Sequence, residues 1–276
     1  MIERIAAGVV VAGIVAVVAM RAGSLSRSGA IAATITGTIA ITAGWGWGAL
    51  LIGYFVSSSA LTRLGAAAKE ARTGAIVEKG GARDAWQVLA NGGVFALAAL
   101  ASIVTRGEGR PAAWAAVAGA GALSAAAADS WSTEIGTWLG GEPRLIMSWR
   151  RVPAGSSGGV TAWGTAGALL GASVITALAV PSVLAPAGLP ASSMPVVLAS
   201  GVFGAFVDSL LGATVQLRRH CPRCDRATER TVHDCGAATR ATGGWAWMTN
   251  DTVNALATVA GALPPLVAAL WAGEPC

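Results

Sequence analysis

Residues 111–128, "PAAWAAVAGAGALSAAAA", form an uncharged run rich in alanine and glycine, and "DSWSTEIG" (129–136) follows it directly. One helix needs about 20 predominantly apolar residues to cross the hydrocarbon core of a bilayer, so the run predicts a membrane span. Asp129 and Glu134 lie at the end of this span. A carboxylate there costs about 2.5 kcal/mol or more unless it faces water, a cation or a partner. The stretch therefore indicates a membrane helix that carries part of a site.

The whole chain has the composition of a polytopic membrane protein. Its 276 residues are 54% hydrophobic and only 12% charged, and the mean hydropathy is +0.61. We therefore expect an all-α bundle, a single integral membrane domain over residues 1–276, with a cytoplasmic Cys/His-containing loop at 218–244. The uncharged runs predict about eight spans, at residues 5–20, 28–44, 45–62, 85–104, 112–139, 160–180, 194–217 and 245–272.

Two of these spans have alternatives. Residues 28–62 could form one tilted span plus a re-entrant piece, because the break near Gly44 is weak. The first apolar segment could be the core of a signal peptide, although no small-residue cleavage pattern ends it. In the longer run, 152–207, four prolines from Pro181 to Pro195 predict the turn between two spans.

Basic residues are distributed unequally between the two sides of the predicted bundle. Sixteen of the 19 Lys and Arg residues lie in loops on one side, and only Arg4, Arg106 and Arg110 lie on the other. Cytoplasmic loops of membrane proteins carry an excess of Lys and Arg, so the sixteen-residue side is predicted to face the cytoplasm, with both termini outside. The formal net charge of +5 therefore reflects topology, and no nucleic-acid partner is expected.

Four carboxylates lie within or at the edge of predicted spans: Asp129, Glu134, Asp208 and Asp251. All four are predicted at similar depth near the cytoplasmic side. Pairing with arginine or hydrogen bonding between helices is one interpretation. The other is a metal site, in which these catalytic carboxylates hold Mg²⁺, the oxygen-seeking ion expected where phosphate is also present.

Polar residues that suit a phosphate-bearing substrate accompany the carboxylates. In "EKGGARDAWQVLANGG" (78–93) and "NDTVN" (250–254), polar side chains recur every four residues and so share one helix face. They line a wet pocket in one interpretation and bind helices together in the other. In "RRVPAGSSGG" (150–159), two arginines precede glycines whose backbone N–H groups can bind anions. The candidate substrate- or nucleotide-binding residues are Lys79, Arg83, Asp84, Gln87, Asn91, Arg150, Arg151, Gly155, Ser156, Ser157, Gly158, Gly159, Asn250 and Asn254.

A short loop, "HCPRCDRATERTVHDCG" (220–236), contains Cys221, Cys224, His233 and Cys235. Three Cys and one His can complete a tetrahedral structural zinc site. A cytoplasmic setting argues against a structural disulfide. Reduced or redox-active cysteines without metal are the alternative.

Together these motifs resemble an integral membrane family. The chain resembles the family that includes plant phytyl-phosphate kinase and animal transmembrane protein 19. The motifs that carry the resemblance are, in order, "EKGGARDAWQVLANGG", "ADSWSTEIG", "RRVPAGSSGGVTAWGTAGALLGA", "VDSLLGATVQ", "CPRC…HDCG" and "WMTNDTVN". The resemblance covers about residues 57–258. It implies a kinase that converts a prenyl monophosphate to the diphosphate with CTP or another nucleoside triphosphate.

The carboxylates, arginines and glycine-rich loop suit this chemistry, since phosphoryl transfer depends on positioning and on neutralising the phosphates. We expect a multi-pass protein of the cell membrane whose active site faces the cytoplasm, with a prenyl-phosphate lipid and a nucleoside triphosphate as partners; a homo-oligomer is left open. The predicted membrane helices contain no histidine or lysine to deprotonate an alcohol, which favours a monophosphate acceptor. The alternatives are a transporter or lipid-phosphate flippase, and a cytidylyltransferase that forms a CDP-lipid.

Overall fold

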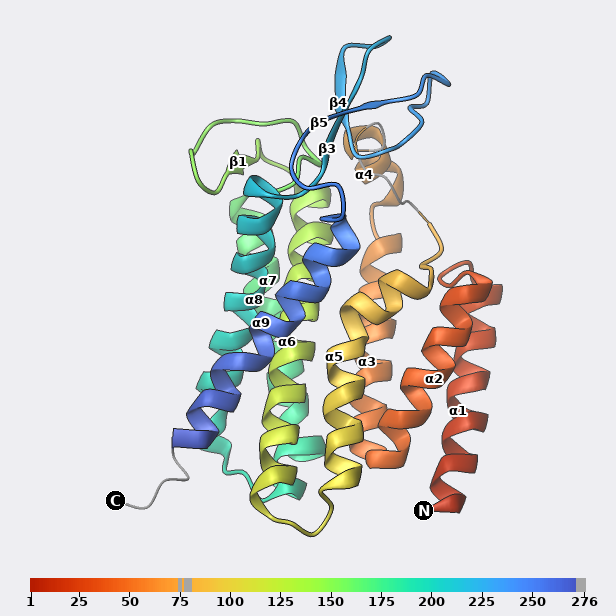
Figure 1. Ribbon diagram of the computed structural model, residues 1–276, viewed down its shortest axis with the longest axis vertical. Coiled ribbons are helices and arrows are strands. Elements are labelled where there is room, and N and C mark those ends of the chain that lie inside the picture. The colour runs from red at the N-terminus through yellow and green to blue at the C-terminus, as the bar shows by residue number, and fades with distance from the viewer. Residues whose placement is uncertain (74–75, 77–80, 272–276) are drawn as a thin grey trace.

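The computed structural model is a bundle of helices with short strands at one end (Figure 1). It describes residues 1–73, 76 and 81–271. The helices are α1 (Ile2–Arg21), α2 (Arg27–Ala43), α3 (Trp45–Arg63), α4 (Ala66–Thr73), α5 (Ala85–Val104), α6 (Arg110–Leu139), α7 (Ala162–Ala179), α8 (Met194–Thr214) and α9 (Asn250–Trp271). All eight predicted segments are helical, and α4 is an addition. The predicted all-α polytopic bundle is confirmed.

Length and hydropathy qualify five described helices as membrane spans: α1, α5, α6, α8 and α7 with its extension to Ala187. The pair α3 and α4 qualifies together as a sixth, although the two are bent by 72°. Of the remaining helices, α2 has 17 residues, and α9 begins with the polar stretch 250–254 and contains Pro264 and Pro265. Five or six of the eight predicted spans are therefore supported by length and composition alone.

The break near Gly44 is real. Gly44 N donates to Ala40 O at 3.1 Å where α2 ends, and α3 begins at the next residue. Residues 28–62 thus form two separate helices, joined at Gly44. The predicted turn after α7 begins later than Pro181. A π-helix (Val180–Leu184) and a 3₁₀ turn (Ala185–Ala187) continue the helix past this proline.

The alanine-rich helix α6 lies at the centre and packs against α5, α7, α8 and α9. Its buried positions are almost all Ala or Gly, and small residues let helix backbones approach closely. A Cβ added to Gly121 would lie 2.3 Å from the carbonyl oxygen of Gly261 in α9, and one added to Gly171 in α7 would lie 2.6 Å from that of Ala127. The alanine-rich run 111–128 thus forms the common packing surface of the bundle.

Short strands and loops cover one end of the bundle. β1 (Arg144–Leu145) pairs with β2 (Gly159–Val160), and an antiparallel sheet has the order β4-β3-β5. Its strands are β3 (Arg218–Cys221), β4 (Arg226–Thr228) and β5 (Arg240–Gly243). This end, which we call the polar end, also holds α4, the end of α6 and the start of α9 (Figure 1).

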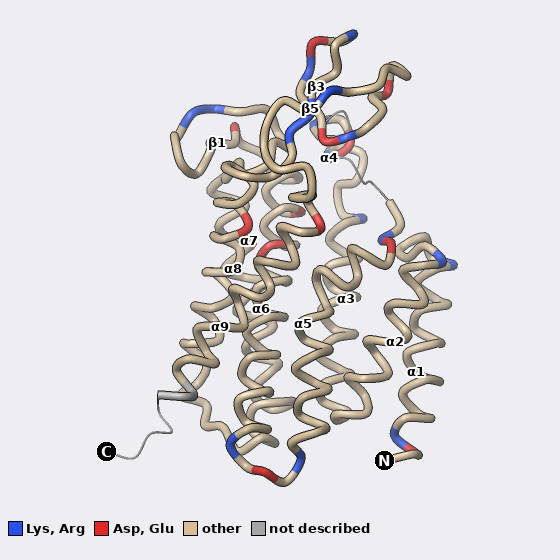
Figure 2. The backbone as a smooth tube through the Cα atoms, in the orientation of Figure 1, with Lys and Arg blue, Asp and Glu red and all other residues tan. Residues whose placement is uncertain are grey.

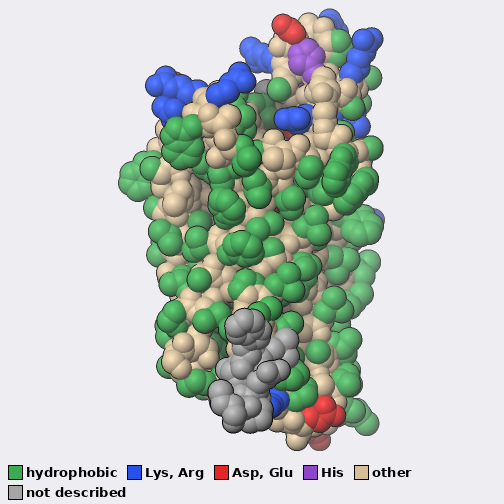
Figure 3. Space-filling model, turned by 60° about the vertical axis from the view of Figure 1, so that its left-hand side comes forward, with side chains coloured by type: hydrophobic (Ala, Val, Ile, Leu, Met, Phe, Trp, Pro, Cys, Tyr) green, Lys and Arg blue, Asp and Glu red, His purple; other side chains and the backbone are tan. Residues whose placement is uncertain are grey.

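The charged residues concentrate at the polar end, as the sequence predicted (Figure 2). Among the described residues at the opposite end, charges lie at the start of α1 and in the loop between α5 and α6 (Figure 2). Hydrophobic side chains cover most of the bundle's face in the view of Figure 3, with Lys and Arg above them. The start of α1 and the end of α9 both lie at the end of the bundle away from the sheet (Figure 1). The one-sided charge distribution therefore corresponds to the two ends of a membrane-embedded body.

Candidate active site

A polar cavity of about 610 Å³ lies at the polar end, bounded by α3 to α6, α8, α9 and the glycine-rich loop. Its lining includes six acidic and five basic side chains. The sequence-predicted residues that line it are Arg83, Gln87, Asn91, Asp129, Glu134, Gly155, Ser156, Ser157, Gly158, Gly159, Asp208, Asn250, Asp251 and Asn254. All four predicted membrane carboxylates thus face one cavity, although they come from three helices.

Asp129 of α6 and Asp208 of α8 interact directly through their carboxyl groups. Asn254 of α9 joins them: with its amide oriented to satisfy its neighbours, its nitrogen lies 3.0 Å from Asp208 Oδ1 and 3.2 Å from the carbonyl oxygen of Asn250. Two facing carboxylates repel each other unless a proton or a cation lies between them. The oxygen donors of this group are of the kind that Mg²⁺ prefers.

Glu134 is already engaged by neighbouring side chains. Lys69 of α4 donates to Glu134 Oε2 at 2.5 Å and is only 9% exposed, while Glu134 is 19% exposed. Thr62 Oγ1 donates to Glu134 Oε1 at 2.6 Å. Lys69 also donates to the carbonyl oxygens of Leu61 and Thr62 at the end of α3. Glu134 is therefore the partner of a buried cation.

Arg83, Gln87 and Asn91, at and after the start of α5, form a polar stripe that lines the cavity. Asp84 caps the helix by accepting from the backbone of Gln87 at 3.0 Å, so it serves the helix end and does not line the cavity. Arg83 does line it, donating to Ser59 and to Thr62 at 3.5 Å each. Asn91 Nδ2 donates to the carbonyl oxygen of Gln87, whereas Asn91 Oδ1 is buried without a partner.

The glycine-rich loop folds against α8 and the Cys/His loop. Gly155 and Gly158 have φ of +88° and +74°, and a Cβ on Gly158 would lie 2.4 Å from Ala213 N. Both positions therefore require glycine. Ser157 donates to Glu229, which also accepts from Gln216 Nε2 at 2.9 Å. Glu229 thus ties the segment after Cys224 to the cavity wall.

Among the described residues, Arg150 and Arg151, like Asp84, do not line the cavity. Arg151 forms an exposed ion pair with Glu142 at 2.8 Å. The carbonyl oxygen of Arg150 accepts from Leu145 N at 2.9 Å and so belongs to the β1–β2 loop. Lys79 lies outside the described residues.

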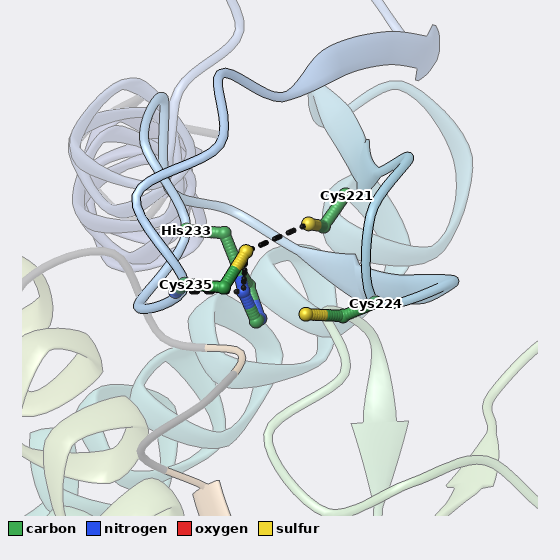
Figure 4. A group of neighbouring side chains, drawn as sticks. All are labelled: Cys221, Cys224, His233 and Cys235. Atoms are coloured by element: carbon green, nitrogen blue, oxygen red, sulfur yellow. Dashed lines mark hydrogen bonds between the residues drawn. The ribbon is translucent and has the colours of Figure 1, made fainter.

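The Cys/His loop gathers its four predicted ligands (Figure 4). One ligand atom from each of Cys221, Cys224, His233 and Cys235 lies within 4.8 Å of the others. Cys221 Sγ and Cys235 Sγ are 3.6 Å apart, close to the ~3.8 Å expected between two sulfurs bound to one zinc. A backbone hydrogen bond at Ala237 and the contact with His233 lower the pKa of Cys235 to about 6. Its thiolate raises the pKa of Cys224 to about 11.

The Cys235 thiolate therefore opposes ionisation of Cys224, and a divalent cation would offset that repulsion. These four side chains fit zinc in donor type and spacing. Among the described residues, they are also the only group of three or more His, Cys, Asp or Glu side chains with ligand atoms this close together. The cavity carboxylates do not form such a compact set.

Several polar residues that line the cavity were not predicted from the sequence, chiefly Lys69, Thr62, Gln216 and Glu229. The signal for Lys69 was present in "AAAKEART" (66–73), whose small apolar face predicts a short helix lying against another surface. Glu229 gives no local signal, because its partners lie in the glycine-rich loop and at the end of α8.

These features define the chain as a polytopic integral membrane protein with a charged cavity at one end of its bundle. It belongs to the family described as integral membrane protein DUF92, which matches residues 10–262. The chain is 30% identical to Protein PGR of Arabidopsis thaliana over 234 residues, covering 79% of this chain and 81% of that protein. The family membership predicted from the motifs is confirmed.

Two further relatives are uncharacterized membrane proteins. The chain is 28% identical to one of Methanocaldococcus jannaschii over 214 residues, covering 76% of this chain and 82% of that protein. It is 28% identical to one of Synechocystis over 223 residues, covering 79% and 72%. No solved structure matches the chain.

Proposed function

We propose that this protein is a Mg²⁺-dependent prenyl monophosphate kinase that uses CTP or another nucleoside triphosphate. The observation that carries the proposal is the cavity at the polar end, where Asp129, Asp208, Asp251 and Arg83 meet beside a glycine-rich loop. Phosphoryl transfer needs positioned charges more than covalent participation by the protein. A charged cavity at the end of an apolar bundle suits the meeting of a soluble nucleotide with a lipid phosphate.

The residues divide into three roles. Asp129 and Asp208, steadied by Asn254, would hold Mg²⁺, which neutralises charge on the nucleotide phosphates when bound. Arg83 and the loop 155–159 bind phosphate oxygens through guanidinium and backbone N–H groups. Glu134 keeps Lys69 at the wall, so Lys69 adds positive charge near the phosphates while it stays paired.

A phosphate oxygen of the acceptor serves as the nucleophile. With a second pKa near 6, a monophosphate is largely dianionic at about pH 7. Its oxygen forms a bond to the terminal phosphorus of the nucleotide as the bond to the bridging oxygen breaks, and the nucleoside diphosphate leaves. No histidine lines the described part of the cavity, and this acceptor does not need a general base.

Orientation follows from the charge distribution, and we propose the cell membrane with the polar end in the cytoplasm. In a Cys276→Ser background, Glu108→Cys and Ser148→Cys each add one reporter cysteine, at opposite ends of the bundle. Cys221, Cys224 and Cys235 remain at the polar end, so labelling is read at position 108 or 148 by peptide mapping. An impermeant thiol reagent added outside intact cells should label the cysteine at 108 and not the one at 148. The opposite labelling would reverse the orientation.

The proposed activity is tested with purified protein, a panel of prenyl alcohols and monophosphates, Mg²⁺ and each nucleoside triphosphate. Mass spectrometry should find a prenyl diphosphate and a nucleoside diphosphate. Pyrophosphate with a CDP-lipid would instead identify a cytidylyltransferase. No product with any acceptor, together with dissipation of an ion gradient by reconstituted protein, would identify a transporter.

A further inference from the structure

A second, apolar pocket of about 70 Å³ adjoins the polar cavity between α1, α2, α3 and α5. The two spaces share Arg83, Gln87 and Asn91 as lining residues, so they meet along the polar stripe of α5. Beyond that stripe the pocket is lined almost entirely by apolar side chains, including Leu51 and Val88. A ligand that occupied both spaces would have a polar end and an apolar end.

The boundary between the two spaces carries groups suited to such a ligand. The guanidinium carbon of Arg83 lies 5.8 Å from the centre of the Phe55 ring, which places a cation over the aromatic wall of the apolar pocket. Tyr54 lines the apolar pocket, and its hydroxyl lies 3.1 Å from Ser130 Oγ in the polar cavity. The buried, unpartnered Asn91 Oδ1 lies on the shared wall. At this boundary, Arg83 could bind the anionic part of a molecule while the apolar pocket binds its apolar part.

The pocket is also close to the surrounding lipid. In the described residues, α1 packs extensively only against α2, and neither α1 with α5 nor α3 with α5 forms a comparable contact. α1 lies at the edge of the bundle (Figure 1) and exposes Val10, Ile14 and Val18. The pocket is therefore separated from the bilayer by one helix layer, and the helix pairs α1–α5 and α3–α5 beside it are loosely packed.

We infer that this pocket holds the part of the prenyl tail next to the phosphate, with the phosphate beside Arg83 and the rest of the tail leaving beside α1 into the bilayer. The inference rests on the proposed function, because it assigns the tail of the proposed acceptor. It predicts that occupancy depends on the free volume next to Gly92, where a Cβ would lie 3.7 Å from the nearest Leu51 atom.

The first experiment is photo-crosslinking of the wild-type protein in lipid nanodiscs. The probe is a prenyl monophosphate with a diazirine in the isoprene unit next to the phosphate. Peptide mapping should place the label on residues 51–55 or 88–92, and excess unlabelled prenyl monophosphate should reduce it. Labelling only on α7, α8 or the outer face of α1 would overturn the inference. This measurement needs neither turnover nor a variant.

The second experiment compares Gly92→Leu with Gly93→Leu. Both add the same side chain to adjacent positions of α5, but Gly93 does not line the pocket, and its added Cβ would meet only Leu89, at 3.9 Å. Gly92→Leu should raise KM for the prenyl monophosphate roughly tenfold or more, because it fills space that buries apolar surface. It should leave KM for the nucleotide unchanged, and Gly93→Leu should resemble wild type.

The outcomes separate the tail site from the proposed function. Equal KM values for the two variants, in a protein that makes diphosphate, would overturn the tail site and leave the kinase. Specific crosslinking at residues 51–55 or 88–92 without phosphorylation of any acceptor would overturn the kinase and leave a lipid-phosphate site.

Discussion

The Cys/His loop and the carboxylate cavity lie at the same end of the molecule but are built differently. The four Cys/His ligands come from residues 221–235 and already lie within 4.8 Å of each other. The four predicted membrane carboxylates of the cavity come from α6, α8 and α9. Two of them, Asp129 and Asp208, face each other, and no compact group of three acidic side chains forms among the described residues of the cavity. One group is complete by itself, whereas the other is an incomplete set of ligands around a space.

This difference has a chemical meaning. A structural zinc site is closed by four protein ligands, while a magnesium ion at a phosphate site keeps waters and phosphate oxygens among its ligands. An open pair of carboxylates therefore suits a metal that arrives with a nucleotide. The compact group suits an ion that holds a loop in shape. Substitutions in the two regions should affect turnover by very different amounts.

The largest effect is expected for Asp208→Asn. Loss of one charge from the facing pair should lower turnover by ~10²–10³-fold, the range found when one transition-state-stabilising group is removed, and should raise the Mg²⁺ concentration needed for half-maximal rate. Glu142→Gln is the control, because Glu142 is an exposed carboxylate at the same end outside the cavity. Equal turnover of Asp208→Asn and wild type at limiting Mg²⁺ would exclude Asp208 as a metal ligand.

An intermediate effect is expected for Lys69→Met, which leaves Glu134 without its cation. Turnover should fall by ~10–100-fold, as for groups that orient a ligand rather than bind it, and thermal unfolding in detergent should show a loss of about 2 kcal/mol. The double variant Lys69→Met/Glu134→Gln should recover much of the stability, because no unpaired charge remains. Strictly additive losses in stability would show that the two side chains are not coupled.

The smallest effect on turnover is expected in the Cys/His loop. Wild-type protein should contain about one zinc per chain; Cys221→Ser should lose it, yet turnover should fall less than ~10-fold, because the loop reaches the cavity mainly through Glu229. His220→Asn is the matched control, since His220 is paired with Asp225 outside the cluster. Zinc-free wild-type protein, or equal zinc loss in both variants, would contradict the assignment.

Much of this arrangement could be predicted from the sequence, because membrane helices are defined by local runs. The predicted segment 85–104 agrees with α5 at both ends, where the Asp84 and Gln87 capping pair fixes the start. The convergence of Asp129, Asp208 and Asp251 also followed from topology, since each was predicted on the same, cytoplasmic side of the bundle. The lengths of the apolar runs and the positions of the charged residues were sufficient to predict these features.

Contacts between distant segments were not predictable in the same way. On a regular helix Asp129 and Glu134 do not share a face, and the structure gives them different partners, Asp208 and Lys69. The position of Lys69 depends on a bend after α3, which leaves little trace in composition. Arg150 and Arg151 are the converse case, since their proximity to the glycines in sequence does not bring them to the cavity.

That bend depends on one residue. Gly65 has φ of +66°, and a Cβ there would lie 2.1 Å from Trp138 at the end of α6. A larger residue would have to adopt a left-handed backbone conformation and displace the Trp138 side chain, so we expect Gly65→Ala to shift α4 and Lys69. The position of Lys69 in the cavity therefore depends on the backbone bend at Gly65. Gly65→Ala should lower turnover as Lys69→Met does, although it changes no charged group.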